Sequence, residues 1–323
     1  MSLFPRRQHP GPYGHNFLIS AYLGVDSIPP GVVIQHGWTP LANALNSDLQ
    51  NCKYLMLCWS ERYQRQWQAT SNVPSRILGA PYIHYRRSLD IQQDVAAKGT
   101  LAFPAHSTRE VQAHFDLDQY CEELKALPSH FQPVAVSLYY GDILHYNLDE
   151  FYRNKGFEVV CSTAGTGKPA YESFYEQLRR FKYTTSNEPG SYSFYSIEMG
   201  IPFFILGELA RRDNTHSRSV DLPCGIYTLR DFPAGDEAYA KFSVGHRDKI
   251  SKEQLEYVLD ETGMRNCASS SELAPLIEGI SKHVQSNGDR RSLFSRVVRI
   301  VKNPQIAIQV FKDWLLYRKH FDK

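Results

Sequence analysis

Short apolar runs alternate with polar, periodically apolar segments along most of the chain. The runs are rich in β-branched and aromatic residues and are bounded by turn residues, as buried strands are. Strands that alternate with helices pair in parallel, so this pattern predicts an α/β fold with doubly wound sheets. The predicted strands are 31–35, 53–58, 76–78, 100–104, 133–139, 157–161, 183–185 and 201–206.

Capping residues and helical periodicity place helices between these strands. Asp116 or Asp118 is suited to cap a helix whose apolar residues recur with helical spacing from Leu117 to Leu127. Residues 207–247 are rich in Arg, Asp, Gly and Pro, which predicts an irregular segment. The predicted helices are 60–68, 117–127, 147–155, 169–181, 190–199, 251–262, 270–285 and 291–320.

The polar segment 88–99 divides the chain, because it lacks apolar periodicity and is typical of a linker. A chain of 323 residues is long enough for two cores. We therefore predict an α/β domain over 1–90, a second α/β domain over 91–285 and a helical tail over 286–323. In doubly wound sheets the ligand binds beyond the carboxyl ends of the strands, so the loops at those ends are the first candidates for a site.

Composition and charge narrow the class of protein. The chain carries a net charge of +2 and has no apolar run near the ~20 residues of a membrane span, which is typical of a globular protein that does not bind nucleic acid. The first residues do not form a signal sequence and the six cysteines lack metal-site spacing, so we expect a cytoplasmic protein without a metal. Nine Lys/Arg and two Asp give segment 290–323 a charge of +7, which leaves −5 for the rest.

A first candidate loop holds His106, Ser107 and Thr108 directly after the strand 100–104. One imidazole and two hydroxyls in a loop are suitable partners for a phosphate. A loop that ends in a Ser/Thr helix cap has the same composition, so that structural interpretation stays open.

A second candidate loop lies between the strand 183–185 and the helix 190–199. The free N–H groups and the positive dipole end of a helix N-terminus bind phosphate without a metal. A capped helix with Gly190 in its turn is the alternative interpretation. The candidate side chains that would add contacts there are Ser186, Asn187, Ser191, Ser193 and Tyr195.

Two residues are candidates for proton transfer. His36 directly follows the first buried strand, and an imidazole titrates near neutral pH, as a general base should. Asp142 in Tyr140-Gly141-Asp142 is the alternative base. Trp38 is a candidate for stacking on a sugar ring. A purely structural role remains open for a lone histidine.

Four segments of the chain resemble glycosyltransferases from bacterial capsule and lipopolysaccharide gene clusters. The resemblance covers residues 99–207, with weaker similarity at 35–38 and 78–81. It implies a GT-B fold, in which two Rossmann-type domains face a cleft, with the acceptor on 1–90 and the nucleotide-sugar donor on 91–285. The segments are GTLAFPAHST, PVAVSLYYGDI, GFEVVCSTAG and FKYTTSNEPGSYSFYSIEMGIPFFILG.

The chain is similar, more distantly, to bacterial sialyl- and Kdo-transferases, which use CMP-sugars and recognise phosphate through His and Ser motifs. This likeness implies sugar transfer from a nucleotide-sugar, with CMP-linked donors favoured, to a surface polysaccharide or lipopolysaccharide, without a metal or other cofactor. It implies that His106, Ser107, Ser191 and Ser193 contact the donor phosphate, and it leaves Glu198 as the candidate for the ribose.

Two other functions stay open, a sugar-nucleotide epimerase on the same fold and a non-catalytic carbohydrate-binding protein. An epimerase needs no acceptor groove, and a binding protein needs no nucleotide. In the segment 290–323, basic residues are interleaved with apolar ones. This pattern predicts either amphipathic helices that return to the first domain or peripheral contact with the anionic inner face of the cytoplasmic membrane, where a lipid-linked glycan acceptor would lie.

Overall fold

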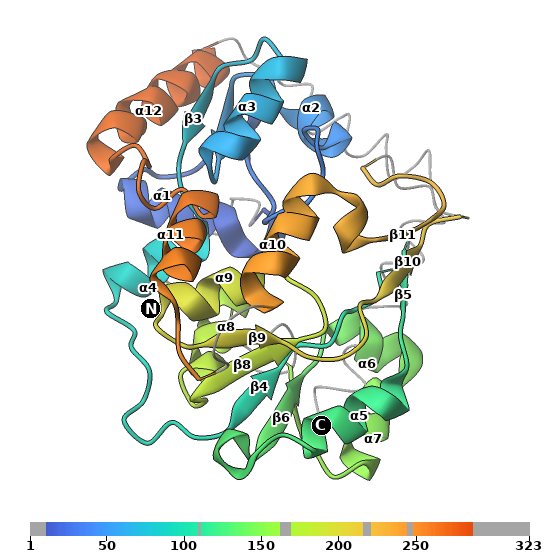
Figure 1. Ribbon diagram of the computed structural model, residues 1–323. Helices are drawn as coiled ribbons and strands as arrows, with labels where there is room; N and C mark the ends of the chain where they lie inside the picture. The colour runs from blue at the N-terminus through green and yellow to red at the C-terminus, as the bar shows by residue number, and fades with distance from the viewer. Residues whose placement is uncertain (1–10, 109–110, 162–168, 216–220, 244–247, 287–323) are drawn as a thin grey trace.

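The computed structural model describes residues 11–108, 111–161, 169–215, 221–243 and 248–286, so the predicted tail lies outside the described residues beyond 286. Figure 1 shows helices around two parallel sheets. One sheet has three strands in the order β1-β2-β3, and the other has five in the order β7-β6-β4-β8-β9. The predicted α/β class with parallel sheets is therefore confirmed.

The strands of both parallel sheets occur where the apolar runs predicted them, with slightly different bounds. β2 and β6 are buried at every position, because helices cover both faces of a parallel sheet. The bounds are β1 (Val32–Ile34), β2 (Leu55–Cys58), β3 (Ser75–Ile77), β4 (Thr100–Ala102), β6 (Val134–Ser137), β7 (Glu158–Val160), β8 (Tyr183–Ser186) and β9 (Phe203–Ile205).

Several helices begin at a residue whose side chain caps them. Ser60 and Asp116 each accept a hydrogen bond from a backbone N–H in the first turn that follows. The predicted Asp116 cap is therefore confirmed. The helices up to the end of the five-stranded sheet are α1 (His15–Leu23), α2 (Asn46–Asn51), α3 (Glu61–Thr70), α4 (Pro81–Ser88), α5 (Leu117–Lys125), α6 (Tyr140–Tyr146), α7 (Leu148–Asn154), α8 (Ala170–Leu178) and α9 (Ser191–Glu198).

Residues 207–247 were predicted to be irregular, but they contribute two strands of a third sheet and a helix. β10 (Arg211–Asp213) pairs antiparallel with both β5 (Gln112–His114) and β11 (Ile226–Thr228). α10 (Pro233–Ser243) then packs against β9. β5 and β10 are largely polar, and all three strands of this sheet are exposed or half-buried, so the sheet lacks the buried apolar runs that would have revealed it.

The last two described helices lead from the second sheet back to the first. α11 (Lys252–Glu261) contacts both α9 and α3, and α12 (Ser270–Ser286) lies beside the three-stranded sheet (Figure 1). Leu273 and Ile277 of α12 enter the core of that sheet next to Ile19 and Leu23. The boundary predicted at 285 grouped this helix with the second sheet, whereas its core contacts are with the first.

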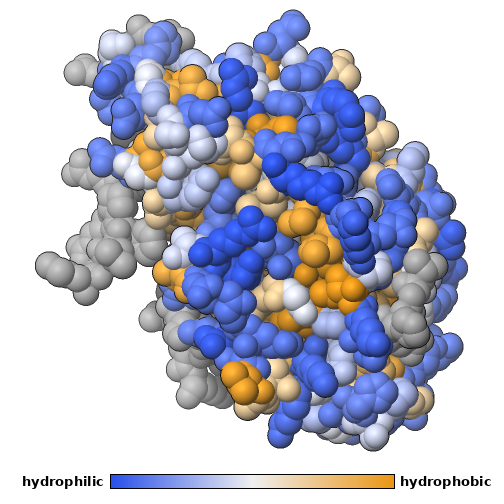
Figure 2. Space-filling view, turned by 60° about the vertical axis from the view of Figure 1, so that its left-hand side comes forward, coloured by the Kyte–Doolittle hydropathy of each residue, from blue (hydrophilic) through white to orange (hydrophobic). Residues whose placement is uncertain are grey.

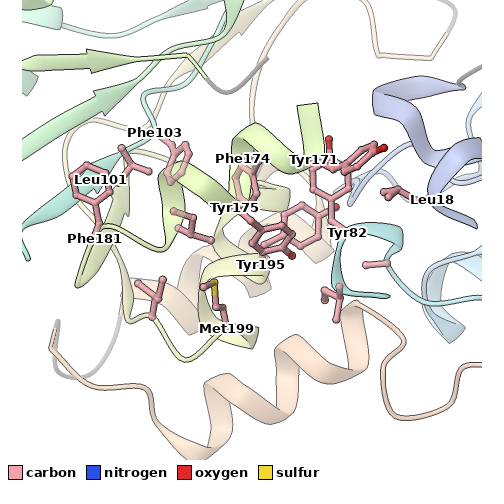
Figure 3. Packing of buried hydrophobic residues seen from close by; sticks show 14 of the residues in the cluster. Leu18, Tyr82, Leu101, Phe103, Tyr171, Phe174, Tyr175, Phe181, Tyr195 and Met199 are labelled. Atoms are coloured by element: carbon pink, nitrogen blue, oxygen red, sulfur yellow. The ribbon is translucent and has the colours of Figure 1, made fainter. Parts of the chain in front are cut away.

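One hydrophobic cluster crosses the predicted domain boundary. Trp59 and Tyr82 from the first part pack with Tyr175 and Tyr195 from the second. Tyr82 and Tyr195 stack with their ring centroids 5.3 Å apart, and Figure 3 shows Tyr82, Tyr171, Tyr175 and Tyr195 gathered between helices of the two parts. Buried contact of this kind holds the two sheets at a fixed relative position. On the face shown in Figure 2, hydrophilic side chains predominate and hydrophobic residues gather near the middle.

Candidate functional site

The strand order of the five-stranded sheet reverses between β4 and β8. In open α/β sheets the ligand crevice lies beyond the carboxyl ends of the two strands at such a reversal. The segments that leave β4 and β8 there are 103–108 and 187–190. The structure therefore brings together two of the loops that the sequence singled out.

A buried ion pair supports the loop after β4. The guanidinium of Arg212 on β10 pairs with Glu188 in the loop after β8, and it donates a hydrogen bond to the carbonyl of His106 at 3.1 Å. Asn187 joins the two loops, because its side-chain oxygen accepts from the N–H of Ala105 at 2.8 Å. The second carboxylate oxygen of Glu188 is buried and has no hydrogen-bond partner among the described residues. Two separate elements thus hold the backbone of this loop, β10 through Arg212 and the loop after β8 through Asn187.

Asp142 in α6 holds the next residue of the loop. Its Oδ1 accepts a hydrogen bond from the N–H of Ser107 at 3.2 Å. Asp142 is 3% exposed, and this burial raises the pKa of its carboxyl to about 7 against the opposing effects of the Ser107 N–H and the Arg212 charge. The carboxyl therefore titrates near neutral pH, as a proton-transfer group must.

The imidazole of His106 is half-buried beside the ring of Tyr139, with 4.9 Å between the ring centroids. Burial, and to a smaller extent the charge of Arg212, lowers the pKa of His106 to about 4. At neutral pH the ring is therefore uncharged and can donate one hydrogen bond to a ligand.

The hydroxyls of Ser107 and Thr108 both take part in the turn that follows. Ser107 Oγ accepts from the N–H of Ala113 at 3.1 Å, and Thr108 Oγ1 accepts from the N–H of Val111 at 3.0 Å. The half-buried Ser107 retains a proton to donate. The element that follows is the strand β5 and not a helix, so the helix-cap interpretation of this loop is wrong. The two hydroxyls stabilise the turn into β5, and the ligand-binding role of the loop stays a prediction.

The N-terminus of α9 meets the loop after β1. Ser191 Oγ accepts a hydrogen bond from the N–H of Trp38 at 3.2 Å. A Cβ at Gly37 would lie 3.1 Å from the same oxygen, so the two backbones approach closely there. The first N–H groups of a helix lack intrahelical partners, and with the helix dipole they favour an anion. The carboxyl ends of both parallel sheets therefore converge at this helix start.

Four other candidates in this region are buried and engaged within the protein. Ser193 Oγ donates to the carbonyl of Gly190 at 2.6 Å, and Ser186 Oγ lies 3.0 Å from a neighbouring tyrosine hydroxyl. Tyr195 stacks in the aromatic cluster, and Asn187 joins the two loops. These side chains shape the loop and the helix start, and they do not present free polar groups to a ligand.

Glu198 lies at the opposite end of α9, which corrects its assignment to the ribose. Its carboxylate accepts hydrogen bonds from Arg86 at 2.7 and 2.8 Å and from Arg87 at 2.8 Å. Since α9 runs from the carboxyl edge of the sheet back to the amino edge, its last residue is far from the loop 103–108. Glu198 instead ties α9 to α4.

His36 follows β1, as predicted, and its side chain is exposed. Its ring packs edge-on against Tyr13, with 4.9 Å between the ring centroids. Although part of the residue is open to solvent, the protein atoms around the ring partly desolvate it and lower the pKa of His36, while the carboxylate of Asp221 partly offsets that shift. An imidazole with a lowered pKa is neutral at pH 7 and ready to accept a proton.

Trp38 is held by groups of the protein. Its Nε1 donates to Glu261 at 2.8 Å, and its ring lies 5.1 Å from that of Phe194. The guanidinium of Arg62 is 6.0 Å from the centroid of the indole ring, over its face. These contacts count against the prediction that Trp38 stacks on an acceptor sugar.

Four residues around these loops were missed from the sequence. Glu188 stands inside the second candidate loop, and Tyr139 directly precedes the motif that contains Asp142, so both had a signal nearby. No nearby sequence signal marks Arg212 or Tyr13. The pairing of β10 with β5 brings Arg212 to the loops, and the turn η1 brings Tyr13 there.

A surface hollow of about 250 Å³ lies away from these loops. It is lined by Lys98, Pro133 and Arg180 at the amino edge of the five-stranded sheet, where Arg180 already pairs with Glu158 at 2.9 Å. Among the described residues, no group of three His, Cys, Asp or Glu side chains is arranged to hold a metal ion. The six cysteines, all of which are described, form no disulfide.

None of the helices within the described ranges is long and apolar enough to cross a bilayer. No family model, curated protein or solved structure matches this chain. Its function is therefore inferred from the motifs and from the geometry of the loops.

Proposed function

We propose that the protein is a metal-independent glycosyltransferase of GT-B type that uses a nucleotide-sugar, with CMP-linked donors favoured, to extend a bacterial surface polysaccharide or lipopolysaccharide. The observation that carries the proposal is the convergence of His36 after β1, the His106 loop after β4 and Ser191 at the start of α9. Doubly wound folds bind nucleotides at such a reversal of strand order. The return of α12 to the first sheet also suits the GT-B arrangement.

In the proposed complex the donor phosphate contacts the loop after β4 and the N-terminus of α9. The His106 imidazole, the hydroxyls of Ser107 and Ser191 and the first N–H groups of α9 supply the hydrogen bonds. Negative charge develops on this phosphate as the sugar leaves, and fixed donors stabilise that charge without reorganising. Burial keeps Asp142 partly protonated near neutral pH, which limits the negative charge beside the phosphate.

On the acceptor side, His36 is the proposed general base. It removes the proton from the acceptor hydroxyl while the new bond forms to the sugar carbon and the bond to the donor phosphate breaks. Its lowered pKa keeps the imidazole in the accepting form at neutral pH. Asp142 is the alternative base, because its pKa of about 7 also suits proton transfer.

A thermal-shift screen across CMP-, UDP-, GDP- and CDP-linked sugars tests the proposal. A ligand at 100 times its dissociation constant adds ~2.7 kcal/mol to stability, so the correct donor raises the melting temperature. Transfer of its sugar to an added glycan then separates a transferase from an epimerase. Failure of every nucleotide-sugar to stabilise the protein would contradict the proposal.

Matched variants locate the phosphate site. We expect His106→Ala and Ser191→Ala each to weaken nucleotide affinity by about tenfold, which corresponds to the loss of one hydrogen bond to a charged group. His145→Ala and Ser88→Ala change exposed residues of the same types and should leave the affinity unchanged. Calorimetry with CMP and with the best donor measures the difference.

We propose that the protein acts at the cytoplasmic face of the membrane, which it contacts through the basic segment 290–323. This segment lies outside the described residues. Cosedimentation with vesicles that contain anionic lipid tests the contact. Neutralising Arg291, Arg296, Arg299 and Lys302 should abolish it, and unchanged cosedimentation would refute it.

A further inference from the structure

The turn before α1 holds Tyr13 in an unusual conformation. In the short helical turn η1 (Pro12–Gly14), Tyr13 has φ 50° and ψ 21°, the left-handed region that residues with a Cβ rarely occupy. Gly11 and Gly14 on either side have φ values of 70° and 80°. Strained backbone of this kind persists only where the surrounding structure enforces it, and it clusters at functional sites.

The strained turn rests on the aromatic cluster that joins the two sheets. The hydroxyl of Tyr82 in that cluster donates to the carbonyl of Tyr13 at 3.4 Å. A Cβ at Gly14 would lie 3.0 Å from the ring of Tyr171, so the turn is packed directly on it. The position of the Tyr13 side chain is therefore set by a rigid core before any ligand arrives, which lowers the entropy cost of binding.

Tyr13 is open to solvent, yet other protein groups surround it. The residue is 43% exposed. Burial by its surroundings nevertheless raises the pKa of its hydroxyl, and Tyr140 adds to the shift. Tyr13 is therefore open to solvent while protein groups lie close to its hydroxyl.

Tyr13 also stands between the two halves of the candidate site. Its ring meets that of His36 at 4.9 Å, while the rings of Tyr139 and Tyr140 are 4.5 Å apart and that of Tyr139 is 4.9 Å from His106. The hydroxyls of Tyr13 and Tyr140 also interact electrostatically, so these three tyrosines form a group of rings between His36 after β1 and His106 after β4. Of its three tyrosines, Tyr13 is the exposed one and the other two are half-buried.

We infer that Tyr13 is the stacking platform for the acceptor, and that its ring packs on the apolar C–H face of a pyranose and brings one hydroxyl of that sugar to His36. The inference rests on the proposed function and deepens it, because it names a sugar ring as the part of the acceptor that is recognised. A rigid, exposed tyrosine suits such a ligand, since its face accepts the C–H groups and its hydroxyl hydrogen-bonds at the edge.

Saturation-transfer NMR with three methyl β-glycosides, of glucose, galactose and N-acetylglucosamine, tests the inference. We expect the wild-type protein to transfer saturation to the ring C–H protons of at least one sugar, and Tyr13→Ala to reduce that transfer about tenfold. Tyr13→Phe keeps the ring and should keep most of the signal. Tyr146→Ala removes a tyrosine that is 46% exposed at the end of α6 and should change nothing.

Tyr13→Gly separates loss of binding from loss of folding. Glycine adopts the left-handed conformation without strain, so this variant should keep its melting temperature and still lose the sugar signal. Unchanged saturation transfer in Tyr13→Ala and Tyr13→Gly would overturn the inference, as would the absence of any signal with the wild-type protein.

Calorimetry with CMP on the same proteins distinguishes a failure of the Tyr13 platform from a failure of the proposed glycosyltransferase function. All four variants should bind CMP as the wild-type protein does, because none of them alters the loops after β4 and β8. Tyr13-dependent sugar binding in a protein that binds no nucleotide would support the platform and contradict the glycosyltransferase.

Discussion

Both carboxylate oxygens of Glu198 accept hydrogen bonds from the guanidinium of Arg86, at 2.7 and 2.8 Å. The two side chains are 2% and 9% exposed, and they join α9 of the second sheet to α4 beside the first. Together with the aromatic cluster, this pair fixes how the two sheets face one another. A wide hinge motion would have to break both contacts, so we expect the site to be largely formed before substrates bind.

Glu198→Gln should lower the free energy of unfolding by about 3–5 kcal/mol, because it leaves the buried Arg86 cation without its counter-ion. Glu122→Gln is the matched control, since Glu122 is 67% exposed and pairs with Lys125. That change should cost less than about 0.5 kcal/mol. Urea unfolding at pH 7 measures both, and equal losses would show that the Glu198 pair contributes little.

Asp142→Asn should stabilise the protein at alkaline pH. The pKa of Asp142 is about 7 in the folded state against an ordinary value of 3.8, so between these values the folded protein binds more protons than the unfolded chain. The wild-type protein therefore loses stability as the pH rises from about 4 to about 7. We expect the variant to match it near pH 4 and to exceed it by up to about 4 kcal/mol at pH 8.

The measurement is the free energy of unfolding of both proteins at pH 4 and pH 8. Asn keeps an oxygen that can accept from the Ser107 N–H, so the loop contact is retained. Asp26→Asn alters an exposed aspartate and serves as the control. A gain that is the same at both pH values would rule out titration of Asp142 as its cause.

His36→Ala should lower kcat by about 10²–10⁴ if His36 is the base. In the wild-type protein, kcat/KM should then decrease as the pH drops below 6.5, which forms the acid limb of the profile, because burial lowers the pKa of His36 from its ordinary value of 6.5. If Asp142 is the base instead, the limb should lie near pH 7 and Asp142→Asn should lose activity. The pH profile of the best donor–acceptor pair decides between them, with His145→Ala as the control.

Arg212→Met should cost about 3–5 kcal/mol of stability, because it leaves the Glu188 carboxylate, 5% exposed, without its partner. The double variant Glu188→Gln/Arg212→Met should regain more than half of that loss in a double-mutant cycle. Nucleotide affinity should stay low in the double variant, since the His106 carbonyl has still lost its hydrogen bond from Arg212. Strictly additive stability losses would show that the two side chains are not coupled.

The strands of the parallel sheets could be predicted because their signals are local. Each is an apolar run next to turn residues, and the Asp116 cap lies within one turn of the helix it starts. β10 and β5 are polar strands that pair across a long stretch of sequence, so no local pattern marks them. α6 was missed because Tyr140-Gly141-Asp142, at its start, has the composition of a turn.

The same limit holds for the candidate site. His106 could be singled out because it lies in the loop that follows a strand of the sheet. Glu198 was misplaced, since its nearness in sequence to the second loop hides that α9 carries it to the opposite edge of the sheet. Arg212 and Tyr13 reach the loops only through tertiary contacts, which a single sequence does not display.

Helix α12 also sets the order in which the protein is completed during synthesis. Leu273 and Ile277 finish the core around Ile19 and Leu23, so this core cannot form until α12, the last described helix, has left the ribosome. The core around β6 draws its buried residues from 102–204 alone and can close earlier. The N-terminal part of the chain is therefore synthesised first but completes its core last. Until then its apolar face stays exposed, and a chaperone would bind there.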